Sequence, residues 1–231
     1  IGFFRFVVVI VHNVGTFIVV PYNRTINTSN VGKWQPLYIP FEAPVSAFGD
    51  NVEIATPYDV NATDDNGDGY ADGLEAVYLM VNKNATLKAN YPYMIKVNDE
   101  ASCEISVVLE DVILSTSNEE DQNSLKCGTI FSDFIFAGSY NTLALDASLE
   151  RTYETQRGEY QLTDNEKSGA TILSMNLGTW YKNTTQDIAA HRVYIVMYNF
   201  AGASYISENA MKSIGVRIIG EENEDGTTVI Y

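Results

Sequence analysis

Short runs of alternating or β-branched hydrophobic residues, broken by Gly, Asn, Asp and Pro, dominate the chain. In EISVVLEDVIL (104–114) the apolar positions fall on one side of a predicted strand, at Ile105, Val107, Leu109 and Ile113. The segments TIFSDFIFAGSY, GATILSMNLGTWY and HRVYIVMYNFAG have the same texture. The pattern therefore predicts an all-β fold with very little helix: an antiparallel β-sandwich, or two packed β subdomains.

Both ends of the sequence have hairpin patterns. FFRFVVVIV and TFIVV, separated by HNVG, predict a hairpin within residues 1–20 that could join the same sheet. GVRIIGEENEDGTTVIY predicts a second one, with Asp225 and Gly226 in the turn. The best helix candidate is SENAMKSI, where Ser207 could cap one or two turns.

The apolar first twenty residues do not predict a membrane span. Arg5, His12, Asn13 and Gly15 interrupt the run, and a spanning helix needs about 20 consecutive apolar residues. No basic start or small-residue cleavage site frames a signal peptide. Residues 21–231 are predicted to form the β-sandwich domain, which could divide near the polar stretches 117–126 or 147–169.

Charge and composition narrow the possible partners. The 231 residues include 30 acidic and 14 basic side chains, a formal charge of −16, which repels nucleic acid and anionic lipid. The sequence therefore predicts no nucleic-acid partner and no membrane insertion. The two cysteines, Cys103 and Cys127, lie outside any CxxC or histidine pattern, so either a disulfide or two reduced core thiols fits.

The acidic stretch DDNGDGYADGLE (64–75) carries the spacing of a calcium-binding loop. Calcium takes six to eight oxygen ligands, and a twelve-residue loop supplies them from positions 1, 3, 5, 7, 9 and 12 around a glycine at position 6. These positions are Asp64, Asn66, Asp68, the Tyr70 carbonyl, Asp72 and Glu75, with Gly69 at the bend.

The residues that flank this loop predict strands, whereas the loops of this kind in EF-hands lie between helices. We therefore keep two interpretations: a structural Ca²⁺ site, or a polar surface turn whose Asp, Asn and Gly residues tolerate left-handed backbone. Five carboxylates within twelve residues repel one another, which favours a bound cation.

Four aromatic residues are candidates for stacking on sugar rings: Trp34, Tyr38, Trp180 and Tyr181. Trp34 and Tyr38 are four residues apart and would share one strand face, whereas the adjacent Trp180 and Tyr181 would point in opposite directions. Packing of these large rings in the core is the competing interpretation.

No catalytic pattern emerges. The chain has two histidines, His12 and His191, and lacks a G-x-S-x-G elbow, a phosphate-binding glycine loop and an HExxH motif. Glycoside hydrolysis needs only two carboxylates across a cleft, so with 30 acids it stays open.

One resemblance covers residues 21–219. The WQPLYIPFE segment, the D-x-N-x-D-G insertion, the LKANYPYMIKV strand and the VYIVMYNF strand together resemble the C-terminal β domain of secreted and surface proteins of Bacteroidetes, often associated with leucine-rich repeats. This resemblance implies export to the periplasm or cell surface, often as a lipoprotein, and implies no reaction. A lone cysteine pair and a calcium site would both suit that compartment.

The sequence therefore predicts a non-enzymatic extracellular or cell-surface module, of an accessory or adhesion type, that binds a glycan or a protein partner. Two alternatives are a carbohydrate-active enzyme or its substrate-binding accessory domain, and a structural spacer. An enzyme would need a groove with two carboxylates roughly 5–10 Å apart.

Overall fold

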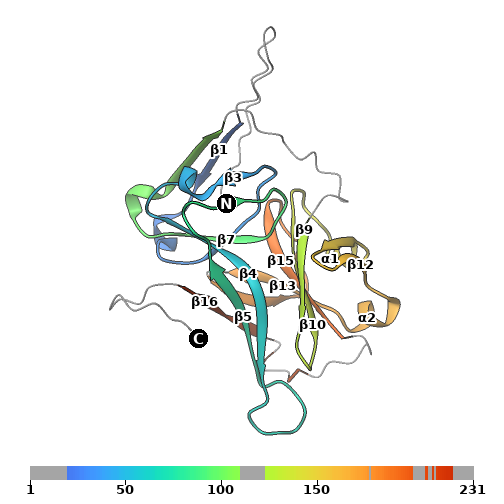
Figure 1. Ribbon diagram of the computed structural model, residues 1–231. Helices are drawn as coiled ribbons and strands as arrows, with labels where there is room; N and C mark the ends of the chain where they lie inside the picture. Colours follow the sequence, from blue (N-terminus) through green and yellow to red (C-terminus); the bar gives the residue numbers. More distant parts are fainter. Residues whose placement is uncertain are drawn as a thin grey trace.

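The computed structural model describes residues 20–109, 123–176, 178–199, 206, 207, 210 and 212–220. The fold is all-β, as predicted, with strands in packed layers and only short helices (Figure 1). The strands are β1 (Val20–Thr25), β2 (Gln35–Leu37), β3 (Ala43–Pro44), β4 (Val52–Thr63), β5 (Gly73–Met80), β6 (Thr86–Leu87), β7 (Tyr93–Val97), β8 (Glu104–Leu109), β9 (Asn123–Gly128), β10 (Asp133–Ser139), β11 (Thr152–Thr155), β12 (Gly158–Gln161), β13 (Thr171–Asn176), β14 (Thr179–Asn183), β15 (Arg192–Tyr198) and β16 (Ser213–Ile219).

Most of these strands belong to one long sheet. Within the described ranges its order is β12-β11-β9-β10-β15-β13-β14-β16-β5-β4-β7-β2, and β1–β8 and β3–β6 form two small separate pairs. The antiparallel prediction holds for most ladders, but β5 pairs with β16 and β9 with β11 in parallel. These two parallel ladders join segments that are distant in sequence, which local hydrophobic patterns cannot reveal.

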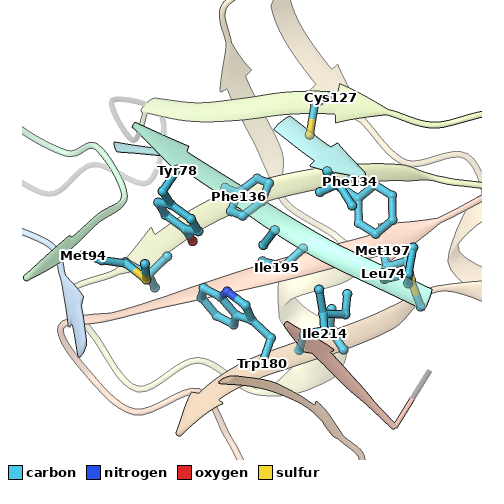
Figure 2. Packing of buried hydrophobic residues seen from close by; sticks show 14 of the residues in the cluster. Leu74, Tyr78, Met94, Cys127, Phe134, Phe136, Trp180, Ile195, Met197 and Ile214 are labelled. Carbon is cyan, nitrogen blue, oxygen red and sulfur yellow. The ribbon is translucent and has the colours of Figure 1, made fainter. Parts of the chain in front are cut away.

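The long sheet folds back on itself and encloses the central core. Strand β4 approaches β9, and β2 approaches β13 and β15, without a ladder between them. Figure 2 shows Tyr78, Phe136 and Trp180 meeting in this space. The rings of Tyr78 and Trp180 each lie edge-on to Phe136, with centroid distances of 5.7 and 6.5 Å. Two layers around one apolar core correspond to the predicted sandwich.

Two further apolar clusters lie outside this core. One joins the β1–β8 pair and the 3-10 helix Val45–Phe48 to β7. The other covers β10, β13 and β15, where Ile135, Ile172 and Tyr194 pack against Tyr153 and Leu162. Each additional cluster buries the second face of a group of strands, so these parts of the sheet are apolar on both sides.

Of the two polar stretches at which the domain could divide, 117–126 lies outside the described residues up to residue 122. The other, 147–169, is described throughout. It contains α1 (Leu145–Leu149), which begins just before it, β11, β12 and α2 (Asp164–Gly169). Helix α2 begins with a capping box in which Thr163 and Glu166 exchange side-chain and backbone hydrogen bonds. We did not predict either short helix, because each is too short to show helical periodicity.

The predicted strands are confirmed where the structure describes them. In β8 the side chains of Ile105 and Val107 are buried and those of Ser106 and Val108 are exposed; Ile113 lies outside the described residues. The predicted hairpin within 1–20 and the turn at Asp225 also lie outside them, apart from the start of β1. Ser207 accepts a hydrogen bond from the Ala210 N–H, a local cap without a described helix.

Within the described ranges, no helix has both the length and the apolar character needed to cross a membrane.

Candidate functional site

The acidic loop joins β4 to β5 and extends beyond the sheet at the bottom of Figure 1. The Asp64 carboxylate accepts hydrogen bonds from the N–H groups of Gly67 (2.7 Å) and Gly69 (3.0 Å). Asp72 turns back to the start of the loop, where its carboxylate accepts from the Asp65 N–H at 3.1 Å. The loop is therefore closed into a ring by its own side chains, which is typical of Asx turns.

The six predicted calcium ligands do not all lie in that ring. Asp64, Asn66, Asp68, Tyr70 and Asp72 belong to the loop, whereas Glu75 lies within β5. The Glu75 carboxylate is 3.0 Å from Arg217 Nε on the neighbouring parallel strand β16. Among the described side chains, no group of three or more His, Cys, Asp or Glu residues is already arranged to hold a metal ion.

Three of the four candidate stacking residues are buried. Trp34, Tyr38 and Trp180 belong to the central core and have exposed fractions of 8%, 2% and 0%. Tyr181 is 46% exposed, so the predicted opposite orientation of Trp180 and Tyr181 is confirmed. Core packing is therefore the interpretation that fits Trp34, Tyr38 and Trp180, and Tyr181 is the candidate with an accessible ring.

Both cysteines are buried free thiols, so the disulfide alternative is not the one found. Cys127 lies on β9 in the central core, where burial raises the pKa of its thiol to about 12. A lone cysteine pair therefore no longer supports an oxidising compartment.

His191, the histidine within the described residues, lies directly before β15. It adopts a left-handed backbone conformation (φ 56°), and its ring lies edge-on to Tyr140 at 5.7 Å. Burial, and then the positive charge of Arg192, lower the pKa of His191. His12 lies outside the described residues.

A polar groove of about 510 Å³ opens beside Tyr181. Its lining comes from β13, β14, the loop 184–191, the start of β15 and Pro36 of β2. Tyr181 pairs with Ser174 across the β13–β14 ladder, so their side chains share one face of the sheet. The other polar side chains in the lining are Asn176, Lys182, Asn183, Thr184, Thr185, Gln186, Asp187 and Arg192.

The loop that forms the rim of this groove is held at both ends. Asn183 donates to Ser174 Oγ (3.0 Å) and to the Gln186 carbonyl (2.7 Å), and its side-chain oxygen accepts from the Gln186 N–H. Ile188 is buried and exchanges two backbone hydrogen bonds with Leu143. The groove is therefore formed before any ligand arrives, as in most small-molecule sites.

Charge in the groove differs from the charge of the whole chain. Two cationic residues, Lys182 and Arg192, and one carboxylate, Asp187, line it, whereas the chain carries −16 overall. Of the residues that line the groove, only Tyr181 was identified as a candidate from the sequence, because loop 184–191 carries no recognisable motif. The only local signal was the exposed position of Tyr181 in the strand alternation.

No protein family model matches the chain, and no curated protein or solved structure matches it. The site must therefore be interpreted from its own geometry and chemistry.

Proposed function

We propose that this chain is a non-enzymatic extracellular or cell-surface module that binds a carbohydrate in the groove beside Tyr181. The observation that carries the proposal is an accessible tyrosine ring at the edge of a preformed groove. Flat rings stack on the faces of sugars, and neighbouring amides and hydroxyls bind sugar hydroxyl groups.

The composition of the lining supports a polar ligand. Asn176, Thr184, Thr185 and Gln186 offer amide and hydroxyl groups, and they are exposed. A site for an apolar ligand would instead be lined mainly by aliphatic and aromatic side chains. Because the rim loop is anchored, little conformational entropy would be lost when a sugar binds.

The number of carboxylates in the groove favours binding over hydrolysis. Glycoside hydrolysis needs two carboxyl groups that flank the scissile bond. Asp187 is the one carboxylate among the described residues that line this groove. The alternative of a carbohydrate-active enzyme would therefore need a second acid from elsewhere.

We also propose a structural Ca²⁺ in the acidic loop, bound by Asp64, Asn66, Asp68, the Tyr70 carbonyl and Asp72. The support is the concentration of carboxylates there without a lysine or arginine partner among the described residues. Glu75 is excluded from this set, because its carboxylate pairs with Arg217. Export to the periplasm or cell surface is proposed on the resemblance and on the calcium concentrations found outside cells.

A comparison of two exposed tyrosines tests the groove. Oligosaccharides made of neutral hexoses, uronic acids and sulfated sugars are titrated into the protein by calorimetry, and into the variants Tyr181→Ala and Tyr58→Ala. Tyr58 is 56% exposed on β4 and does not line the groove, so it is a matched control. We expect Tyr181→Ala to weaken binding about tenfold, which is about 1.4 kcal/mol, and Tyr58→Ala to leave it unchanged.

The proposal fails if none of these sugars binds at millimolar concentration. Equal losses in the two variants would also contradict it, because they would place the contact outside the groove.

A further inference from the structure

Arg192 is a cation in the groove that has no counter-ion among the described residues. It lines the groove and is partly buried, and no described residue accepts a hydrogen bond from its guanidinium or forms an ion pair with it. A partly desolvated guanidinium that lacks an acceptor is unfavourable. Arginine is the side chain whose planar geometry suits carboxylate and sulfate groups.

A second guanidinium, that of Arg24, is hydrogen-bonded to Pro36, which lines the same groove as Arg192. Arg24 is 7% exposed, and it donates to the Pro36 carbonyl at 2.8 Å and to Gln35 Oε1 at 3.4 Å. Burial, and then the positive charge of Arg24, lower the pKa of Arg192. The described partners of Arg24 are neutral, so the two like charges are not balanced locally.

We infer that the groove selects a carbohydrate with a negatively charged substituent, a carboxylate or a sulfate, and that Arg192 binds this group. The inference rests on the proposed carbohydrate function and adds the class of sugar. An anion there would give Arg192 its missing acceptor and would relieve its repulsion with Arg24.

The lining favours an acidic sugar over an acidic peptide. Tyr181 and the amides and hydroxyls of the rim suit a ligand rich in hydroxyl groups, which a sugar offers and an acidic peptide does not. The net charge of −16 also opposes non-specific adsorption of polyanions. Binding of an acidic oligosaccharide would therefore report a local site.

The test compares charged ligands with their neutral counterparts. Calorimetry measures the affinity of oligogalacturonate against its methyl ester, and of dextran sulfate against dextran, so that the carboxylate and sulfate arms are separate. Oligoaspartate is the peptide control. We expect at least one anion to bind about tenfold more tightly than its neutral counterpart, and oligoaspartate to bind no better than the neutral sugars.

The variant Arg192→Gln should abolish this preference for the charged ligand and change the affinity for the neutral one by less than about twofold. Arg157→Gln is the matched control. It removes the same charge from the exposed turn between β11 and β12, outside the groove lining, and should retain the preference. Arg192→Lys should retain part of the preference for the charged ligand, because lysine keeps the positive charge but lacks the planar pair of donors.

Thermal melting separates a binding role from a structural one. Because Arg192 has like charge beside it and no described acceptor, Arg192→Gln should melt no lower than the wild type. If that variant unfolds instead, Arg192 has a structural role and the inference is overturned. The wild-type comparison of each anion with its neutral partner is independent of any variant.

The outcomes distinguish the two proposals. If no sugar binds, the proposed function of the groove fails. If charged and neutral sugars bind equally, or if Arg192→Gln and Arg157→Gln lose the preference alike, the carbohydrate proposal stands and the selection by Arg192 is wrong. Equally tight binding of oligoaspartate would also overturn the inference.

Discussion

Gly138 is the position at which the central core tolerates an added methyl group least. It lies in β10 opposite Val193 of β15, directly against the buried Tyr38 ring. A Cβ atom at Gly138 would lie 2.2 Å from Tyr38 Cδ2 and 2.3 Å from Cε2. Contacts below 3.0 Å essentially never occur, so either the ring or the strand must move.

Neither movement is easy. Tyr38 is 2% exposed, and the Tyr140 ring lies on it with a centroid distance of 4.6 Å. The Gly138 carbonyl accepts from Arg151 Nη1 at 3.1 Å, and the same nitrogen donates to the hydroxyl of Tyr194 at 2.7 Å, so the strand is tied to the apolar cluster that contains Tyr194. Overpacking of this kind lowers the free energy of unfolding by about 1–3 kcal/mol. Because the neighbouring ring is rigid, we expect Gly138→Ala to cost about 2–3 kcal/mol. The melting temperature should then fall by about 4–12 °C.

Urea denaturation and thermal melting measure this cost, with Gly215→Ala as the matched control. Gly215 is also a strand glycine, but its added Cβ would meet only the Leu74 carbonyl at 3.8 Å. We expect Gly215→Ala to change stability by less than about 1 kcal/mol. In the double variant Tyr38→Leu/Gly138→Ala, most of the Gly138→Ala cost should disappear, giving a coupling energy of about 2 kcal/mol. The packing that we describe is refuted if Gly138→Ala is as stable as the wild type. It is also refuted if the costs of the two single substitutions simply add in the double variant.

Three further predictions concern the core and the acidic loop. The Tyr38 hydroxyl is buried without a hydrogen-bond partner among the described residues, so Tyr38→Phe should be neutral or stabilising in urea denaturation. Tyr153→Phe, which removes the hydrogen bond to the Ser148 carbonyl, should cost about 1–2 kcal/mol. Burial raises the pKa of the Cys127 thiol from 9.0 to about 12, so as the pH rises the unfolded state loses this proton before the folded state does. The free energy of unfolding, measured by urea denaturation, should therefore fall between these two pH values. It should fall less steeply in Cys127→Ala than in the wild type. With the submillimolar affinity of an extracellular module, calcium at 5 mM should raise the melting temperature by about 3–6 °C. Asp64→Asn should abolish this shift. If calcium does not shift the melting temperature of the wild type, the proposed site is wrong.

Local patterns were enough to predict the strands of the sheet. Alternating burial in β8 and the runs that became β10, β13, β14 and β15 follow from side-chain period and β propensity. The parallel ladders β5–β16 and β9–β11 could not be predicted, because pairing between distant segments depends on the assembled core. The short helices α1 and α2 were missed for a related reason, since each spans less than two turns.

The candidate site was less accessible to sequence reasoning than the fold. Composition alone could not separate a buried tryptophan from an exposed one, so Trp34 and Trp180 were counted with Tyr181. Glu75 matched the calcium pattern by spacing, but its partner Arg217 comes from a strand 142 positions later (217 − 75) that only the folded sheet brings alongside. Arg24, which donates to the Pro36 carbonyl, and Arg192 are likewise distant in sequence, and only the fold brings both to the groove that Pro36 lines.

Strand β14 links the core to the proposed binding surface. Trp180 is fully buried and lies edge-on to Phe136, and it pairs with Ile214 of β16, so the backbone on either side of it has little freedom. The next residue, Tyr181, is directed outward by the pleat of the same strand. Its ring is therefore held in position by residues that no ligand touches, as in sites built on rigid elements. It follows that a substitution at Trp180 should weaken carbohydrate binding as well as stability, whereas a substitution at Tyr181 should weaken binding alone.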